Sequence, residues 1–108
     1  MPRSAKLAHG DPFDALGDPN RRAIVEQLRD GPRSVAEITA RMQISQPAVS
    51  RHLRLLKSAR LVVDEPDGAR RLYSLSEEGA EAIRAYMEEV WGDALTRFQL
   101  VASNPPRR

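Results

Sequence analysis

Apolar residues recur at helical spacing through most of the chain and alternate with polar residues in one short region. The segment 19–30 has one apolar face, which predicts an amphipathic helix. Asp18 precedes it as a candidate N-cap, Pro19 occupies its first position, and Gly31-Pro32 follows as a stop. A shorter helix is expected over 11–16. The charged positions of the longer helix are expected to remain in solvent: Arg21, Arg22, Glu26 and Arg29.

A second pair of helices is expected in the next part of the chain. Ser34 and Glu37 have the spacing of a capping box, which opens a short helix. Ser45 is a candidate N-cap for a further helix that runs to about residue 58. The apolar positions of that helix are expected in the core: Val49, Leu53 and Leu56. Because only a few residues around 42–44 join these two helices, they form a candidate helix-turn-helix.

The pattern then changes to the alternation that is typical of strands. Residues 61–65 and 70–75 are predicted to pair as a β-hairpin around Pro66-Asp67-Gly68, because these residue types favour turns. Ser76 is expected to cap a helix of about 25 residues that follows. The expected fold class is therefore mainly α with a small β-hairpin (α+β).

Length and composition indicate one globular domain. The chain has 108 residues, 41% of them hydrophobic and 30% charged, which is enough for a single core. We expect this domain over 11–102, with a flexible arm at 1–10 and a disordered tail at 103–108. Since the chain has no cysteine, disulfides, thiolate metal sites and thiol redox sensing are excluded. No apolar run approaches the roughly 18 residues of a membrane span and the start lacks a secretory signal, so a cytoplasmic location is expected.

The charge distribution is more informative than the net charge of +2. Six basic and three acidic residues lie between positions 51 and 71, whereas six acidic residues and one arginine lie between 77 and 93. One basic region on a nearly neutral protein suits a polyanionic partner. The alternative interpretation is that both regions are solvated faces.

Four stretches together resemble one known family: ALGDPNRRAIVEQL, VAEI, SQPAVSRHLRLLKSARLV and RRLYSL. In order and spacing they are similar to the ArsR (SmtB-type) family of bacterial transcription repressors, over roughly residues 13–100. The resemblance implies a winged helix-turn-helix that forms a homodimer through its first and last helices. It also implies a sequence-specific regulator of transcription that binds double-stranded DNA. In this family the helix 45–58 would enter the major groove, and the hairpin 61–75, called the wing below, would lie at its flank.

The helix 45–58 carries the residue types that contact DNA. When its apolar positions face the core, Arg51 and Arg54 point away from it. Arginine can bond a guanine edge and Gln46 an adenine edge, while Ser45 and the free N–H groups of the first turn suit a phosphate. The candidate DNA-binding residues are Ser45, Gln46, Pro47, Ser50, Arg51, His52, Arg54, Arg70 and Arg71.

Four of the basic and apolar residues on this helix and on the wing have alternative roles. His52 lies near the core boundary, so it either forms a structural hydrogen bond or contacts a phosphate. Leu55 is expected to pack against a neighbouring element rather than a thymine methyl group. For the wing, we expect one of Arg70 and Arg71 to contact the DNA backbone or minor groove. The alternative is that these arginines only protect an edge strand.

The last helix carries more apolar surface than a small domain needs. This excess predicts a homodimer interface, which the resemblance implies as well. The expected interface residues are Phe13, Leu16, Ile83, Met87, Val90, Trp91, Ala94, Leu95 and Phe98. A twofold dimer would place its two recognition helices about 34 Å apart on an inverted-repeat operator. The alternative is that the apolar residues belong to the core of a monomer.

The residues that serve metal sensing in this family are not found here. The helix before the recognition helix has no cysteine, and the last helix has acidic residues but no histidine. Carboxylates without imidazole make poor sites for transition metals, so neither a metal nor another cofactor is expected. Two alternatives remain open for control: a repressor without an effector, or one that binds an apolar small ligand near Trp91 and Phe98 at the dimer seam.

Two other classes of function were weighed. An enzyme is rejected, because the chain has no phosphate-binding loop and no nucleophile–base pair; Ser50 and His52 lie on different faces of one helix. A winged-helix module that binds another protein would show an apolar or acidic face at 45–56, whereas this chain shows Arg51 and Arg54. It is kept as the alternative. Repression is expected rather than activation, since a compact dimer would block a promoter.

Overall fold

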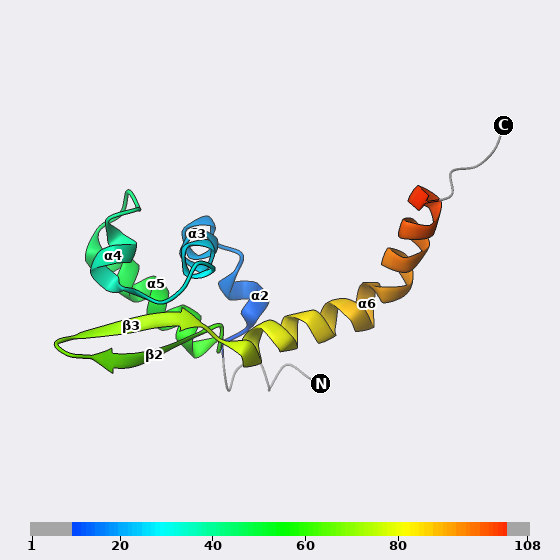
Figure 1. The fold of residues 1–108 in the computed structure, drawn as a ribbon. Helices are drawn as coiled ribbons and strands as arrows, with labels where there is room; N and C mark the ends of the chain where they lie inside the picture. The colour runs from blue at the N-terminus through cyan, green and yellow to red at the C-terminus, as the bar shows by residue number, and fades with distance from the viewer. Residues whose placement is uncertain (1–9, 104–108) are drawn as a thin grey trace.

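The helices and strands form a small body from which the last helix extends (Figure 1). The computed structural model describes residues 10–103, except for the side chains of residues 95, 102 and 103. Its elements, in chain order, are α2 (Pro12–Ala15), α3 (Pro19–Leu28), β1 (Arg33–Ser34), α4 (Val35–Thr39), α5 (Gln46–Ser58), β2 (Val62–Asp67), β3 (Arg70–Leu75) and α6 (Glu77–Ser103). Every predicted helix is present, and the expected mainly α fold with a small sheet is confirmed.

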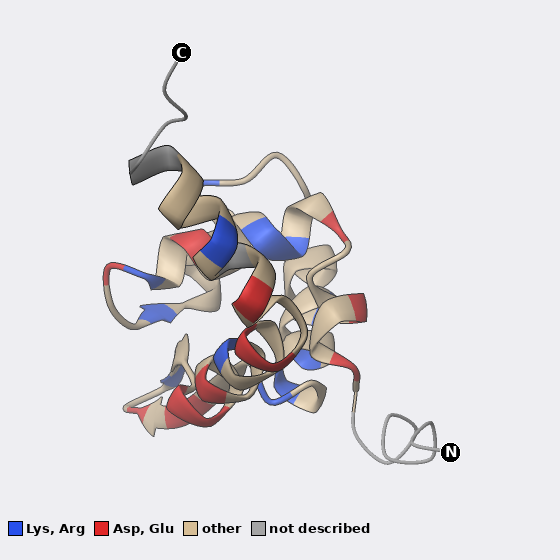
Figure 2. Ribbon diagram, turned by 90° about the vertical axis from the view of Figure 1, so that its right-hand side faces the viewer, with Lys and Arg blue, Asp and Glu red and all other residues tan. Residues whose placement is uncertain are grey.

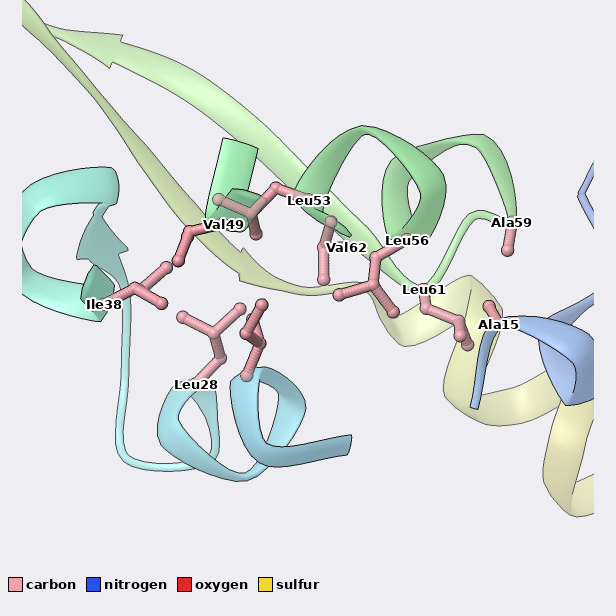
Figure 3. Close-up of a cluster of buried hydrophobic side chains, with 10 residues drawn as sticks. Ala15, Leu28, Ile38, Val49, Leu53, Leu56, Ala59, Leu61 and Val62 are labelled. Carbon is pink, nitrogen blue, oxygen red and sulfur yellow. The ribbon is translucent and has the colours of Figure 1, made fainter. Parts of the chain in front are cut away.

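The core lies where α3, α4 and α5 meet the base of the hairpin (Figure 3). The three apolar residues predicted for α5 are at most 1% exposed, and Ile24 and Ile38 are completely buried. Leu61 and Val62 extend the core from the end of α5 into the sheet. Burial of each such side chain contributes about 1.5–3 kcal/mol to stability. Because the buried residues come from both α5 and the base of the wing, the cluster holds the wing against α5.

The sheet has three antiparallel strands in the order β1-β3-β2. The hairpin turn is shorter than predicted: Pro66 and Asp67 belong to β2, and Asp67 pairs with Arg70 across a two-residue loop. Gly68 opens that loop with φ +64°, a conformation that glycine adopts without strain. Pro66 is compatible with β2 because this strand lies at the sheet edge and bonds only β3.

The predicted helix caps are confirmed at atomic detail. Asp18 accepts hydrogen bonds from the backbone N–H groups of Asn20 and Arg21, at 2.8 and 3.2 Å. Ser34 and Glu37 form a complete capping box, in which the Ser34 N–H donates to Glu37 Oε1 at 2.8 Å. Ser76 accepts from the Gly79 N–H at 3.2 Å and so caps α6.

At each end of the predicted domain 11–102 one further residue takes part in the fold, while the bounds of the domain stay a prediction. Gly10, assigned to the flexible arm, donates its N–H to the Ser58 carbonyl at 3.0 Å. At the other end α6 continues through Ser103. The rest of the predicted arm and tail, 1–9 and 104–108, lies outside the described residues. Within 10–103 no helix is long and apolar enough to cross a membrane.

Stability is expected to fall in acid because four carboxylates are stabilised in their charged form, one of them Glu81, whose pKa a hydrogen bond from Arg84 lowers. Hydrogen bonds from Lys57 and Arg71 lower the pKa of Asp64. The Ser34 N–H lowers the pKa of Glu37. Burial raises the pKa of Asp18, but the N–H groups of Arg21 and Asn20 outweigh this effect and lower it.

A carboxyl whose pKa is lower in the folded state stabilises that state above its unfolded pKa, and this stabilisation is lost as pH falls through the folded pKa. The free energy of unfolding should therefore be level near neutrality and decrease below about pH 4. Urea denaturation between about pH 7 and pH 3 measures it, and Glu37→Gln should flatten part of the slope. Equal stability of the wild type at both ends of this range would contradict the prediction.

Candidate nucleic-acid interface

Helix α5 separates an apolar face from a basic face. Its buried residues pack into the core, and on the opposite side Arg51 and Arg54 are exposed. No acidic residue lies on this helix between Gln46 and Ser58. The predicted orientation of the two arginines is therefore observed: both reach solvent from the middle of α5.

The N-terminus of α5 is accessible as well. Ser45 caps it, with its Oγ accepting from the Ala48 N–H at 3.3 Å. Ser45, Gln46 and Pro47 are exposed, and Ser50 is half-buried beside them. These residues and the two arginines, all at least partly exposed, are called the α5 face below. An α-helix with such a surface fits the major groove, where its N-terminal side chains reach base edges.

His52 is not part of the α5 face. Its residue is 8% exposed, and its Nδ1 lies 3.2 Å from a terminal nitrogen of Arg21. Because a guanidinium group can only donate, Nδ1 accepts and the imidazole carries its proton on Nε2. Of the two roles considered, the geometry favours the structural hydrogen bond, and we remove His52 from the set of DNA contacts.

Arg21 was expected in solvent, and the structure corrects this. Its Nε donates to the Ala15 carbonyl at 2.6 Å while another nitrogen bonds His52. Arg22 similarly donates to the Leu16 carbonyl at 2.8 Å. The last carbonyl groups of α2 have no following helical turn whose N–H groups could bond them. The two arginines donate to these carbonyl groups instead. Arg21 connects α2, α3 and α5 through one side chain.

Leu55 is 47% exposed on the outer side of α5. It follows Arg51 by four residues, so it lies beside that arginine on the same side of the helix. The choice between a neighbouring element and a thymine methyl group as its partner stays a prediction.

Both wing arginines are engaged with carboxylates. Arg70 bonds Asp67 at 3.2 Å and approaches Glu37 at 3.7 Å; both acids are about half exposed. Arg71 donates from Nε to Asp64 at 2.7 Å, and the Asp64 side chain is only 6% exposed. Lys57 of α5 reaches the other oxygen of the same carboxylate at 2.8 Å. The link from α5 to the wing through Lys57 and Asp64 was missed, because the helical period of α5 does not indicate which strand residue meets Lys57.

The apolar residues expected at a dimer interface divide into two groups. Leu16 and Ile83 are half-buried against the core, so they contribute to the monomer. Phe13 and most of the residues on α6 are exposed, and the ring of Phe13 lies 4.8 Å from that of Tyr86. The side chain of Leu95 is not described. The smaller Ala94 is exposed as well, and the large exposed apolar residues of α6 are Tyr86, Met87, Val90, Trp91, Phe98, Leu100 and Val101.

The position of these residues follows from the length of α6. Its first turns pack on the core, and Gly79 and Ile83 lie on the contacting side. The same face continues past the body of the domain at Met87 and Val90, where α6 extends alone (Figure 1). No segment of the described chain covers this continuation. Acidic residues, red in Figure 2, recur along the same helix.

An apolar cavity of about 130 Å³ lies at the base of α6. Its lining comes from α2, α3, the sheet and α6: Leu16, Val25, Leu61, Leu75, Ser76, Ala80 and Ile83. Trp91 and Phe98, near which one of the two alternatives for control placed an apolar ligand, do not line it. In the described part of the chain, no cluster of three or more histidine, aspartate or glutamate side chains is placed to hold a metal ion.

Comparisons with known proteins agree with this architecture. A model of the arsR family of bacterial regulatory proteins matches residues 18–63, from α3 to the start of β2. The HTH-type transcriptional regulator Rv2034 of Mycobacterium tuberculosis is 48% identical over 92 residues, which cover 84% of this chain and 86% of that protein. The transcriptional repressor SmtB of the same species is 42% identical over 70% of this chain, which spans just over half (56%) of it.

A solved structure supports the same assignment. The crystal structure of a possible transcriptional regulator for arsenical resistance superposes with a TM-score of 0.71 at 35% identity, over 89% of this chain and 98% of that one. The predicted winged helix-turn-helix fold is thereby confirmed. This chain belongs to the ArsR family of bacterial regulatory proteins, which are DNA-binding transcription regulators and not enzymes.

Proposed function

We propose that this protein is a dimeric repressor that binds an inverted-repeat operator through the α5 face. The single observation that carries the proposal is the exposure of Arg51 and Arg54 on the side of α5 opposite its buried stripe, with Gln46 exposed at the N-terminus of the same helix. Side chains so placed on a recognition helix reach base edges when the helix enters the major groove. A repressor that binds DNA in this way would act in the cytoplasm.

Each residue of the α5 face has a role suited to its chemistry. Arg51 bonds a guanine through two donors, and Gln46 bonds an adenine. Ser45 and the N–H groups of the first turn hold a phosphate, which fixes the register of the helix. Pro47, Ser50 and Arg54 line the same contact. Leu55, exposed beside Arg51, is available to a thymine methyl group.

In the wing, Arg70 is the residue proposed to contact DNA. Its partners Asp67 and Glu37 are about half exposed, and pairs of this kind are weak and readily exchanged. Arg71 is held by the shielded carboxylate of Asp64. Arg70 also lies next to the hairpin loop, where a wing meets the flanking backbone or minor groove.

The dimer is proposed to form between the exposed apolar faces of α6, with Phe13 of α2 at its margin. Val90 and Trp91 are each about half exposed, and Phe98 is 75% exposed. Exposed apolar area of this extent marks an association surface. A twofold axis through it would pair two recognition helices with two half-sites. Repression follows when such a dimer occupies a promoter.

The proposal predicts that Arg51→Ala weakens operator binding by roughly 5- to 150-fold, equivalent to about 1–3 kcal/mol. The loss should be accompanied by relaxed base preference at one position of each half-site, because a guanine contact is removed. A mobility-shift titration on the DNA upstream of the gene, with and without base changes, measures both effects.

Arg97→Ala is the matched control. It removes the same charge from the exposed outer half of α6 and should leave operator affinity within about twofold. If the two variants lose affinity equally, general charge rather than the α5 face would carry the binding. A promoter–reporter fusion tests repression separately, since its output should rise when the gene is deleted.

A further inference from the structure

Asp64 joins the two elements that the proposed function brings to DNA. Its Oδ1 lies 2.8 Å from Lys57 Nζ of α5, and its Oδ2 lies 2.7 Å from Arg71 Nε of β3. Asp64 itself belongs to β2. One carboxylate therefore binds two cations that come from the recognition helix and from the wing.

The burial of these three side chains is unequal. The Asp64 side chain is 6% exposed, whereas Lys57 and Arg71 are 55% and 52% exposed. The cations cover the carboxylate and themselves face solvent. This differs from the pairs of Arg70, whose acidic partners Asp67 and Glu37 are about half exposed. A shielded carboxylate with two charge-assisted hydrogen bonds holds its partners more firmly than an exposed one.

We propose that Asp64 is a positioning residue that determines specificity for DNA: it restrains Lys57 and Arg71 from phosphate contacts and holds the wing against α5. This inference rests on the proposed DNA binding. Phosphate contacts carry no sequence information and supply most of the affinity for non-specific DNA. By keeping two exposed cations on an internal partner, Asp64 makes binding depend more on the base contacts of the α5 face.

The inference leads to a measurable salt dependence. Each phosphate contact adds about 0.9 to the slope of log affinity against log salt concentration. Releasing Lys57 and Arg71 should therefore steepen that slope by up to about two for each protomer. A residue with only a structural role would change the melting temperature but leave the slope unaltered.

The experiment uses Asp64→Asn, which keeps the size of the side chain and its ability to accept hydrogen bonds. Fluorescence anisotropy measures affinity for the operator and for a scrambled duplex of equal length, from about 50 to 300 mM salt. We expect a steeper slope on the scrambled duplex, roughly tenfold tighter binding to it near 100 mM, and a specificity ratio that falls roughly tenfold. Adding Lys57→Gln to this variant removes one of the two released cations, so it should reverse about half of the change in slope.

The matched control is Glu65→Gln. Glu65 is the next residue on β2 and is exposed, so its replacement changes the net charge equally without releasing Lys57 or Arg71. Circular dichroism establishes that each variant is folded. The role of Asp64 is overturned if Asp64→Asn and Glu65→Gln change the salt slope equally, or if Asp64→Asn leaves the slope unchanged. In both cases the proposed function stands, provided that the wild type still discriminates the operator from scrambled DNA. If the wild type fails to discriminate the operator from scrambled DNA, the proposed function fails and this inference with it.

Discussion

Replacing Val90 with glutamate is expected to separate the proposed dimer into monomers and to weaken operator binding by about 10²- to 10⁴-fold. Val90 is 52% exposed in the middle of the apolar face of α6, and a charge there would have to be buried on association at high cost. A dimer binds its second half-site at an effective concentration near the millimolar range, and a monomer loses this advantage. The folded core is far from Val90, so the melting of each domain should change little.

Light scattering after gel filtration measures the first effect, because the monomer mass is 12.1 kDa. Ala85→Glu is the matched control. It places the same charge on the opposite side of α6, at an exposed position, and should leave both mass and operator affinity unchanged. A Val90→Glu protein that still elutes with the mass of a dimer would contradict an interface on this face.

Gly79→Ala is expected to destabilise the protein by about 3 kcal/mol. Gly79 lies where the first turn of α6 crosses the end of α5. A Cβ atom there would lie 3.0 Å from the Leu61 Cα and still closer to the Arg60 carbonyl oxygen. Both are backbone atoms, so no side-chain rotation relieves the contact. The better helix propensity of alanine, about 1 kcal/mol, offsets only part of this cost.

Thermal unfolding at one fixed protein concentration measures the loss, which should lower Tm by about 10–20 °C. Gly92→Ala makes the same substitution later in α6, where a Cβ atom would meet nothing within 4 Å. This control should raise stability by about 0.5–1 kcal/mol. Equal effects of the two variants would show that helix propensity, and not the crossing of α6 over α5, decides the outcome.

The helices and their caps were predicted because their signals are local. Asp18, Ser34, Ser45 and Ser76 each satisfy N–H groups within three residues of themselves, so the sequence alone contains the whole interaction. The α5 face was predicted for the same reason, since helical periodicity fixes which side chains oppose a buried stripe.

The errors share a different cause. Strand β1 has two residues and exists because Arg33 and Ser34 pair with Tyr73 and Leu72, far along the chain. No two-residue segment has a detectable period. The wing loop was misplaced because Pro66 was taken as a turn residue, although an edge strand tolerates it.

Charged residues were the least predictable part of the candidate site. Arg21 was placed in solvent by the helical pattern, but its partners Ala15 and His52 come from α2 and α5. Asp64 was counted only among the acidic residues between positions 51 and 71, while its contact with Lys57 depends on how the wing packs on α5. Such contacts are set by tertiary structure, which periodicity does not describe.

The position of Pro66 in the edge strand has a consequence for the behaviour of the protein in concentrated solution. The free side of a β-hairpin is a template on which a strand of another molecule can add and begin aggregation. Here the free side belongs to β2, whose Pro66 lacks an N–H group and whose neighbours Glu65 and Asp67 are exposed acids. A β2 strand from a second molecule would find no N–H donor at Pro66, and its own acidic residues would be repelled by Glu65 and Asp67. A projecting hairpin of this composition resists recruitment into intermolecular sheets.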